Sequence, residues 1–357
     1  MTFLVIILFF VLIYMIFLIW CHFRFPETHW NWDEIDVKEI KFPKKFMWGT
    51  ATAAHQVEGS CNNNNWFEWE NSKDDLGNSR IKDNQLSGKA CDHWNRYEED
   101  IKMILELGVS HYRFSIEWSK VEPKKGYYDR KVINHYSNVI DKLLENNITP
   151  VITLHHFTNP TWFDNLGGFE REQNISIFVQ FCEKIFDEYS SRVNLWCTIN
   201  EPEVYSMMGY FVGVFPPGQK NPNQAVNVLK NLLVAHTAVY TKLKSLKNGE
   251  KSKIGIVKNV MQFDPYRRWN LLDWIVCILT NSIYNGIALS YLKTGKINIR
   301  IPFFININYS DPLAAKKTDF FGLNYYSHSH LKFKANLNEF FENKFFAKDT
   351  MTDMPYV

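Results

Sequence analysis

The regular alternation of short apolar segments with longer amphipathic ones is the feature that most constrains the fold of this chain. Segments of strand character lie at residues 46–52, 109–115, 149–155, 193–199, 253–258 and 318–323. Helical periodicity covers residues 93–107, 130–146, 172–190, 222–246 and 270–293. Strands that alternate with helices predict parallel βα units, each of about 30 residues or more. The 357 residues therefore predict an α/β fold, an incomplete (β/α)8 TIM barrel with about six of its eight units.

The amino terminus has a different character. Residues 3–20 form an apolar and aromatic run without charge, Gly or Pro, which is long enough to span a bilayer. A cleaved signal peptide would show a basic start, a shorter apolar region and small residues before the cut, so we favour an uncleaved transmembrane helix over that alternative. The expected organisation is a membrane anchor at 1–22, a juxtamembrane linker at 23–41 and a partial barrel at 42–357.

The side of the membrane stays open. Basic residues after the apolar run favour a barrel on the cytoplasmic side. Glycosylation sequons at Asn147, Asn174 and Asn308 would instead be usable in a lumen. The sequence thus predicts a single-pass, membrane-anchored protein without deciding its orientation.

Composition excludes several classes of partner. Hydrophobic residues make up 46% of the chain, which suits a globular domain with a large core. The 40 basic and 38 acidic side chains leave a net charge of +2 with no basic stripe, so no nucleic-acid partner is expected. The six cysteines lack metal-ligand spacing, which predicts no metal site and mostly free thiols. A bridge between Cys61 and Cys91 is the alternative for a luminal domain.

The segment Thr198–Pro202 (TINEP) carries the strongest functional signal. It delivers Asn200 and Glu201 at the carboxyl end of a predicted strand, where parallel barrels hold their chemistry. A buried carboxyl group without a partner is forced toward its neutral form, which is what a general acid needs. The structural alternative is a Glu201 that caps the next helix, with Pro202 in its first turn.

Four other segments surround this one in a characteristic order. They are residues 42–59 (FPKKFMWGTATAAHQVEG), 112–119 (YRFSIEWS), 153–157 (TLHHF) and 319–326 (DFFGLNYY). Together with TINEP they resemble glycoside hydrolase family 1, the retaining β-glucosidases and their relatives, from about Phe42 to the last residue. The resemblance implies a hydrolase of β-glucosides or β-galactosides that requires no cofactor.

The resemblance also implies catalytic roles. Glu201 corresponds to the general acid/base, which protonates the leaving oxygen and then activates water. The related thioglucosidases carry Gln at this position, so Glu201 argues against that branch. Asn200 would hold the sugar 2-hydroxyl, unless it only caps the helix. Arg113 and Tyr326 would position and ionise the nucleophile.

Substrate-binding residues follow in the same way. Gln56 and His156 match the clamp on the sugar, and both side-chain types can donate and accept hydrogen bonds. Asn324 would line the same wall of the pocket, and Trp162 would flank its entrance or pack in the core. A satisfied core histidine is the alternative for His156.

Two nearby residues are expected to be structural. His155 precedes His156 on a strand and so points to the opposite side. Glu117 is expected to be a carboxylate paired with an arginine.

The resemblance is incomplete in one respect. A retaining glycosidase needs a second carboxylate about 5 to 5.5 Å from the first. The family carries it in a Thr-Glu-Asn-Gly segment, and none follows Tyr326 here; Glu339 and Glu342 suit a loop or helix. The expectation is therefore a truncated or incompletely sequenced family member that does not hydrolyse glycosides as printed. The alternative is an inactive barrel that binds sugars or proteins, or a pseudogene or fragment product.

Overall fold

The computed structural model describes residues 2–26, 34–301, 305–326, 328–335 and 341–344. The chain divides into two compact units. Unit 1 combines residues 1–46, 260–286 and 325–357, and unit 2 combines residues 47–259 and 287–324.

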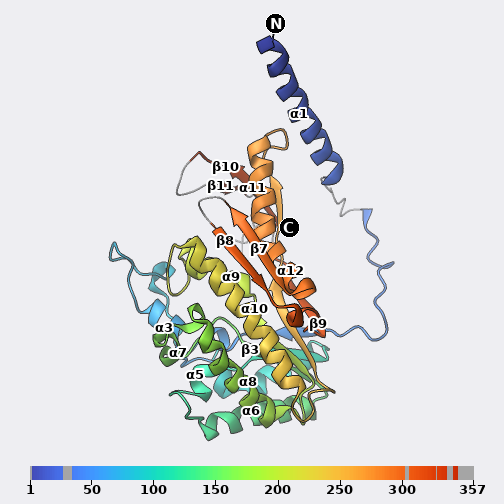
Figure 1. Cartoon of the computed structure of the whole chain (residues 1–357). Coiled ribbons are helices and arrows are strands. Elements are labelled where there is room, and N and C mark those ends of the chain that lie inside the picture. The colour runs from blue at the N-terminus through green and yellow to red at the C-terminus, as the bar shows by residue number, and fades with distance from the viewer. Residues whose placement is uncertain (1, 27–33, 302–304, 327, 336–340, 345–357) are drawn as a thin grey trace. The chain divides into compact units, whose positions relative to one another are not determined.

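Unit 2 is built on a parallel sheet of six strands (Figure 1). In spatial order they are β1 (Gly49–Ala51), β2 (His111–Ser115), β3 (Thr149–His155), β4 (Leu195–Asn200), β5 (Lys253–Asn259) and β9 (Phe320–Asn324). Each of the six predicted strand segments contains or overlaps one of these strands, and every neighbouring pair is parallel. The prediction of an α/β fold with six parallel strands is thus confirmed.

The helices of unit 2 follow the predicted periodicity closely. They are α4 (His93–Glu106), α6 (Arg130–Glu145), α8 (Ile175–Tyr189) and α10 (Pro222–Lys244). The carboxylate of Asp129 accepts the backbone N–H groups of Lys131 and Val132 and so begins α6. Helix α6 packs on β3, while α10 packs on β4, β5 and α8. These contacts hold in place the strands whose carboxyl ends form the candidate site.

The fifth predicted helix, at 270–293, corresponds to a helical stretch at residues 271–294 that contains a π-helical turn. The structure divides it into α11 (Leu271–Asn281), a π-helical turn (Ser282–Gly286) and α12 (Ile287–Thr294). At the turn, the amide of Asn285 donates to the Met261 carbonyl and to Oδ1 of Asn281. Apolar periodicity does not reveal such polar contacts at a π turn.

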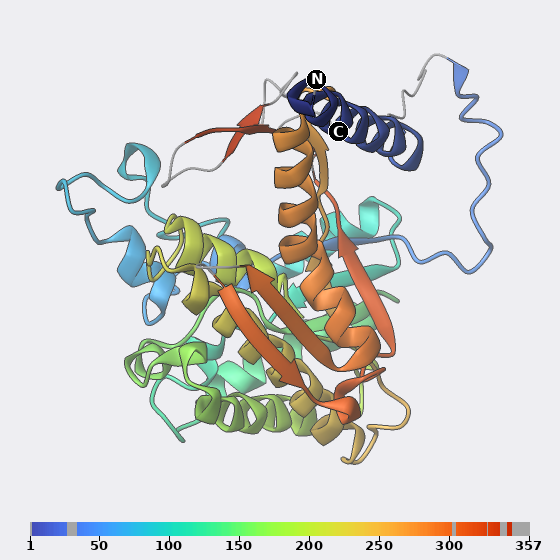
Figure 2. The same ribbon diagram turned by 45° about the horizontal axis from the view of Figure 1, so that its top comes forward.

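The sequence reasoning also missed a hairpin. Strands β7 (Lys296–Ile301) and β8 (Ile305–Ser310) pair antiparallel, and β8 lies against α10 (Figure 2). The alternation of Ile with polar residues along residues 296–301 is the period-two signal that could have found it.

Unit 1 contains the apolar amino-terminal helix α1 (Thr2–Arg24), which ends two residues beyond the expected anchor. It also holds β6 (Gln262–Pro265), β10 (His328–Phe333) and β11 (Phe341–Lys344), in the order β11-β10-β6. Glu342 lies on β11 and not in the expected loop or helix, because this segment pairs with β10. Glu339 lies outside the described residues.

Two described helical stretches are long and apolar enough to cross a membrane. Within α1 the apolar side chains are exposed over most of its length, whereas the stretch at residues 271–294 is 44% buried in its most apolar window. Such burial is typical of a core helix, so α1 is the better candidate for a membrane anchor or a signal sequence.

Candidate active site

Glu201 stands at the carboxyl end of β4, directly before the short helix α9 (Pro202–Met207). Its backbone has φ 48° and ψ 62°, a left-handed conformation that is uncommon for a residue with a side chain. Its N–H donates to the carbonyl of Val257 on β5 at 2.7 Å. The residue is only 5% exposed, so the fold holds this carboxyl group in a strained and enclosed position.

A chain of hydrogen bonds joins Glu201 to three other strands. Arg113 on β2 donates from Nε to Thr153 Oγ1 at 2.8 Å and from Nη2 to Asn200 Oδ1 at 2.5 Å. The amide of Asn324, at the end of β9, donates to Glu201 Oε1 and, at 3.4 Å, to Asn200 Oδ1. These bonds bring four of the predicted site residues together: Arg113, Asn200, Glu201 and Asn324.

His156 joins the same network. Asn200 Nδ2 lies 3.2 Å from His156 Nε2. Burial and the nearby Arg113 guanidinium lower the pKa of His156 to about 3, so the ring is neutral and its Nε2 accepts this bond. His155 is buried on the opposite side of β3 and pairs with Asn159 Oδ1 at 2.9 Å, as the strand alternation predicts.

The electrostatics of Glu201 reflect opposing effects. Burial raises the pKa of this carboxyl group above its ordinary value, because the charged form loses hydration. Hydrogen bonds from Asn324 and Asn259 and the positive charges of Arg113 and Lys258 act in the other direction. The net direction is upward, which favours the protonated form that a general acid uses.

Two of the remaining predicted residues, Gln56 and Trp162, make no side-chain hydrogen bond to this network among the described residues. Gln56 is exposed on α2 (Ala54–Val57), just after β1. Trp162 donates its indole N–H to the Glu122 carbonyl at 2.8 Å and packs edge-on against Trp118. Tyr326 is half-exposed and belongs to unit 1. The proposed roles of these three residues therefore stay predictions.

Glu117 is structural, but its expected arginine partner is wrong. The carboxylate is fully buried and accepts hydrogen bonds from Asn64, Ser119 and Thr158 at 2.6 to 3.2 Å. The contacts of this carboxylate among the described residues are these three neutral side chains, and none is an arginine. Neutral side-chain donors suffice because three of them converge on one carboxylate.

Three residues beside Glu201 escaped the sequence reasoning. Asn259 hydrogen-bonds to the Glu201 side chain. Lys258 Nζ lies 3.3 Å from Glu203 Oε1, and both side chains are at most 1% exposed. The signal was present, since a lysine at the end of the apolar strand segment 253–258 is unusual and charged groups are rarely buried without a partner.

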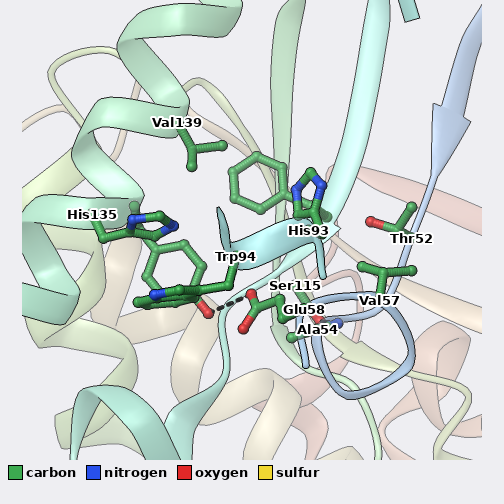
Figure 3. A pocket seen from close by; sticks show the side chains of 11 residues that line it. Thr52, Ala54, Val57, Glu58, His93, Trp94, Ser115, His135 and Val139 are labelled. Atoms are coloured by element: carbon green, nitrogen blue, oxygen red, sulfur yellow. Dashed lines mark hydrogen bonds between the residues drawn. The ribbon is translucent and has the colours of Figure 1, made fainter. Parts of the chain in front are cut away.

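A separate small pocket opens between the first two strands and helices α4 and α6 (Figure 3). Within it Tyr136 donates to Glu58 at 2.7 Å, and Trp94 stacks on His135 with ring centroids 3.8 Å apart. Lys120 Nζ donates to Glu58 at 2.9 Å and lies over the Trp94 ring. Because these groups satisfy one another, the cluster is best understood as packing beneath the barrel wall.

Metal and disulfide chemistry find no support in the described residues. No group of three or more His, Cys, Asp or Glu side chains that could hold a metal ion occurs among them. All six cysteines are free thiols, so the alternative bridge between Cys61 and Cys91 is not formed.

Comparison with known proteins identifies the family. The sequence pattern of Glycosyl hydrolase family 1 matches residues 38–353. The chain belongs to glycosyl hydrolase family 1. Beta-glucosidase A of Thermotoga maritima is 34% identical over 312 residues, which cover 82% of this chain and 67% of that protein. The human cytosolic beta-glucosidase is 30% identical and is covered to 68% of its length.

Solved family 1 structures share the fold. A β-glycosidase from Pyrococcus horikoshii superposes with a TM-score of 0.74 at 37% identity, covering 87% of this chain and 68% of that one. The family 1 β-glucosidase of Thermotoga maritima gives a TM-score of 0.81 at 30% identity, covering 89% and 73%. The six-stranded sheet is thus part of a family 1 fold, and the chain is by family a β-glycosidase.

Proposed function

We propose that this chain carries the acid/base part of a retaining O-glycosyl hydrolase site for β-glucosides or β-galactosides, with Glu201 as the general acid/base and without the nucleophile segment of the family. The observation that carries the proposal is the placement of Glu201, an almost fully buried carboxyl group at the end of β4 whose pKa is raised by burial. The relatives called β-glucosidases support the substrate class. No cofactor or metal is needed for this reaction.

The proposed reaction gives a role to several side chains at the strand ends. Protonated Glu201 gives its proton to the glycosidic oxygen as the aglycone leaves, and the resulting carboxylate later takes a proton from water. Asn200 donates to the sugar 2-hydroxyl from Nδ2, while its Oδ1 is held by Arg113. Arg113 and Tyr326 are proposed to occupy the positions that orient the attacking carboxylate in the family; no residue of this sequence is assigned to that carboxylate, so an added anion would have to attack the anomeric carbon in its place.

Substrate binding is proposed to use residues from several strand ends. His156 and Asn324 come from the ends of β3 and β9, and Gln56 comes from the helix after β1. Trp162 is proposed to flank the entrance. Clamping a sugar needs such groups from different directions, because each hydroxyl both donates and accepts.

Membrane attachment is the second part of the proposal. Helix α1 has 23 residues, no acidic group in its first turn, and His22 and Arg24 in its last turn. This length spans the hydrocarbon core of a bilayer. We propose single-pass anchoring through residues 3–20, with the linker 23–41 between the anchor and the barrel at 42–357.

The test of the catalytic role compares two aryl glucosides. Phenyl β-glucoside has a basic leaving group that needs protonation, whereas 2,4-dinitrophenyl β-glucoside leaves as the anion. Azide is added because it attacks the anomeric carbon without losing a proton, so cleavage does not depend on a nucleophile from the chain. The products are the glucosyl azide and the phenol or phenolate.

The expected result is a selective loss. Glu201→Gln should lower cleavage of the phenyl glucoside by about 100-fold or more, with a much smaller effect on the dinitrophenyl glucoside. Glu117→Gln is the matched control, because it also neutralises a buried barrel carboxylate but should leave the ratio of the two rates unchanged. Equal losses for both substrates in Glu201→Gln, or no cleavage by the unaltered chain with azide, would refute the proposed role.

A further inference from the structure

Helix α11 of unit 1 is apolar on both of its faces. Its inner face packs in the core, where Val276 and Cys277 are buried with Leu331 of β10. Its outer face presents aliphatic side chains that are 38 to 44% exposed: Leu272, Ile275, Ile278 and Leu279. No charged residue occurs between Asp273 and Lys293. A surface helix of a globular protein turns polar and charged groups outward, so this outer face calls for something that covers it.

Contacts with the amino-terminal segment indicate what covers it. The hydroxyl of Tyr14, on α1, donates to the carbonyl of Trp269, just before α11. Arg268 Nη2 donates to the Phe25 carbonyl at 2.5 Å. The rings of Phe25 and Trp274 lie 5.8 Å apart. Within unit 1, the amino end of α11 therefore lies against the helix that is proposed to enter the bilayer.

These contacts also set a depth. Trp20 ends the apolar run of α1, and Tyr14 precedes it by six residues, or about 9 Å along an α-helix. The start of α11 would then lie about 9 Å inside that end of the run. Helices that lie in a membrane interface bury their apolar faces by about 5 to 10 Å. The exposed indole of Trp269 suits this place, because tryptophan is enriched at membrane interfaces.

We propose that the outer face of α11 lies in the lipid interface beside α1, as a second contact of this chain with the membrane. This inference rests on the proposed anchoring through α1. The occupant is the upper acyl-chain region of the bilayer, because aliphatic side chains make up the face.

Lipid charge has little part in this contact, because the neighbouring arginines already have carboxylate partners. Arg267 Nη2 lies 2.8 Å from Asp273 Oδ1. Arg268 Nη1 lies 3.8 Å from Asp264 Oδ1. The contact should therefore depend on burial of apolar surface and not on anionic headgroups.

The experiment places a fluorescent label on the outer face of α11 in the full chain. The chain is held in phosphatidylcholine nanodiscs, one chain per disc, so that water-soluble reagents reach both sides. Cys91→Ser removes the exposed native thiol, and Ile275→Cys then carries the fluorophore NBD. Dithionite, a dianion that does not enter hydrocarbon, reduces NBD in water. A phospholipid with a doxyl group near the top of its acyl chain quenches NBD in the interface.

The expected result is protection by lipid. Dithionite should reduce NBD at position 275 about 10-fold or more slowly than NBD at Met103→Cys, the matched control, an exposed apolar position on α4. The doxyl lipid should quench the label at 275 and not the control. Addition of phosphatidylserine should leave both readings unchanged. Leu272→Glu/Leu279→Glu should return the reduction rate at 275 toward that of the control, because carboxylates do not stay at this depth.

Two results would overturn the inference. Reduction at 275 as fast as at 103 would show that the outer face of α11 is in water. Slow reduction without doxyl quenching would show that protein covers it, and so would protection that appears only with several chains per disc.

A second label separates this inference from the anchoring itself. If NBD at Leu12→Cys is quenched by a lipid with a deep doxyl group while NBD at 275 is reduced rapidly, α1 is an anchor and the inference on α11 is wrong. If NBD at 275 is quenched but carbonate releases the full chain from membranes, the interfacial contact holds and the anchoring through α1 is wrong.

Discussion

Replacing Asp164 by Asn should make the protein less sensitive to alkaline pH. Asp164 lies in α7 (Thr161–Asn165), and its Oδ1 accepts a hydrogen bond from Asn159 Nδ2 at 2.7 Å. Asn159 in turn contacts His155 and Tyr205, so this carboxyl group belongs to the packing beneath the site. Burial raises the pKa of Asp164 from 3.8 to about 7, and the nearby carboxylates Glu68 and Glu170 add to the rise.

The sign and size follow from the difference in pKa between the folded and unfolded states. The folded state binds the Asp164 proton more tightly, so this contribution to stability is complete below about pH 4 and is lost as the pH rises through about 7. A rise from 3.8 to about 7 corresponds to about 4 kcal/mol at about 1.4 kcal/mol per unit. Because the side chain is only partly shielded from solvent, about 2 to 4 kcal/mol is the expected range.

The assay is urea unfolding followed by tryptophan fluorescence at pH 5 and pH 8.5. Because pH 5 already lies about one unit above the unfolded-state pKa of 3.8, part of the contribution is lost before this interval, and the unaltered chain should lose about 1 to 2.5 kcal/mol more unfolding free energy over it than Asp164→Asn does. Glu203, whose pKa is also raised to about 7, contributes equally to both proteins and cancels in the comparison. The exposed Asp75→Asn is the control and should follow the unaltered chain. Identical pH dependence for Asp164→Asn and the unaltered chain would refute the reasoning.

Three further predictions concern the site, the sheet and the anchor. Asn324→Ala removes a hydrogen-bond donor to the ionised form of Glu201. The midpoint of the Glu201 pH titration, measured by carboxyl NMR, should therefore rise by about 1 to 2 pH units. A fall of this midpoint would contradict the hydrogen-bond network. Gly255→Ala should lower the free energy of unfolding in urea by about 1 to 3 kcal/mol, because the new Cβ would lie 2.6 Å from the Phe320 carbonyl oxygen on β9. An unchanged urea midpoint would show that β5 and β9 can move apart at little cost. Deletion of residues 2–24 should move the protein from the carbonate-resistant membrane pellet to the supernatant, and a deletion product that still pellets as a folded protein would refute anchoring through α1.

Periodicity predicted the regular part of the fold well. Apolar strands and amphipathic helices repeat along the chain because each βα unit must bury one face against its neighbours. This burial produces a hydrophobic periodicity that can be read from each segment of the sequence alone. The π-helical turn after Asn281 and the β7–β8 hairpin were missed. Both depend on contacts made in three dimensions, such as the Asn285 bond to Met261 and the packing of β8 on α10.

The sequence by itself determined which chemical groups reach the strand ends. Ordered motifs placed Glu201 after β4, Arg113 on β2 and Asn324 at the end of β9, because position along a parallel strand decides which edge a residue reaches. Only the tertiary structure decided how these groups act on one another. Charge, burial and hydrogen bonding depend on distances between segments far apart in the chain, so the pairing of Lys258 with Glu203 beside the acid/base became visible only once β5 lay next to β4.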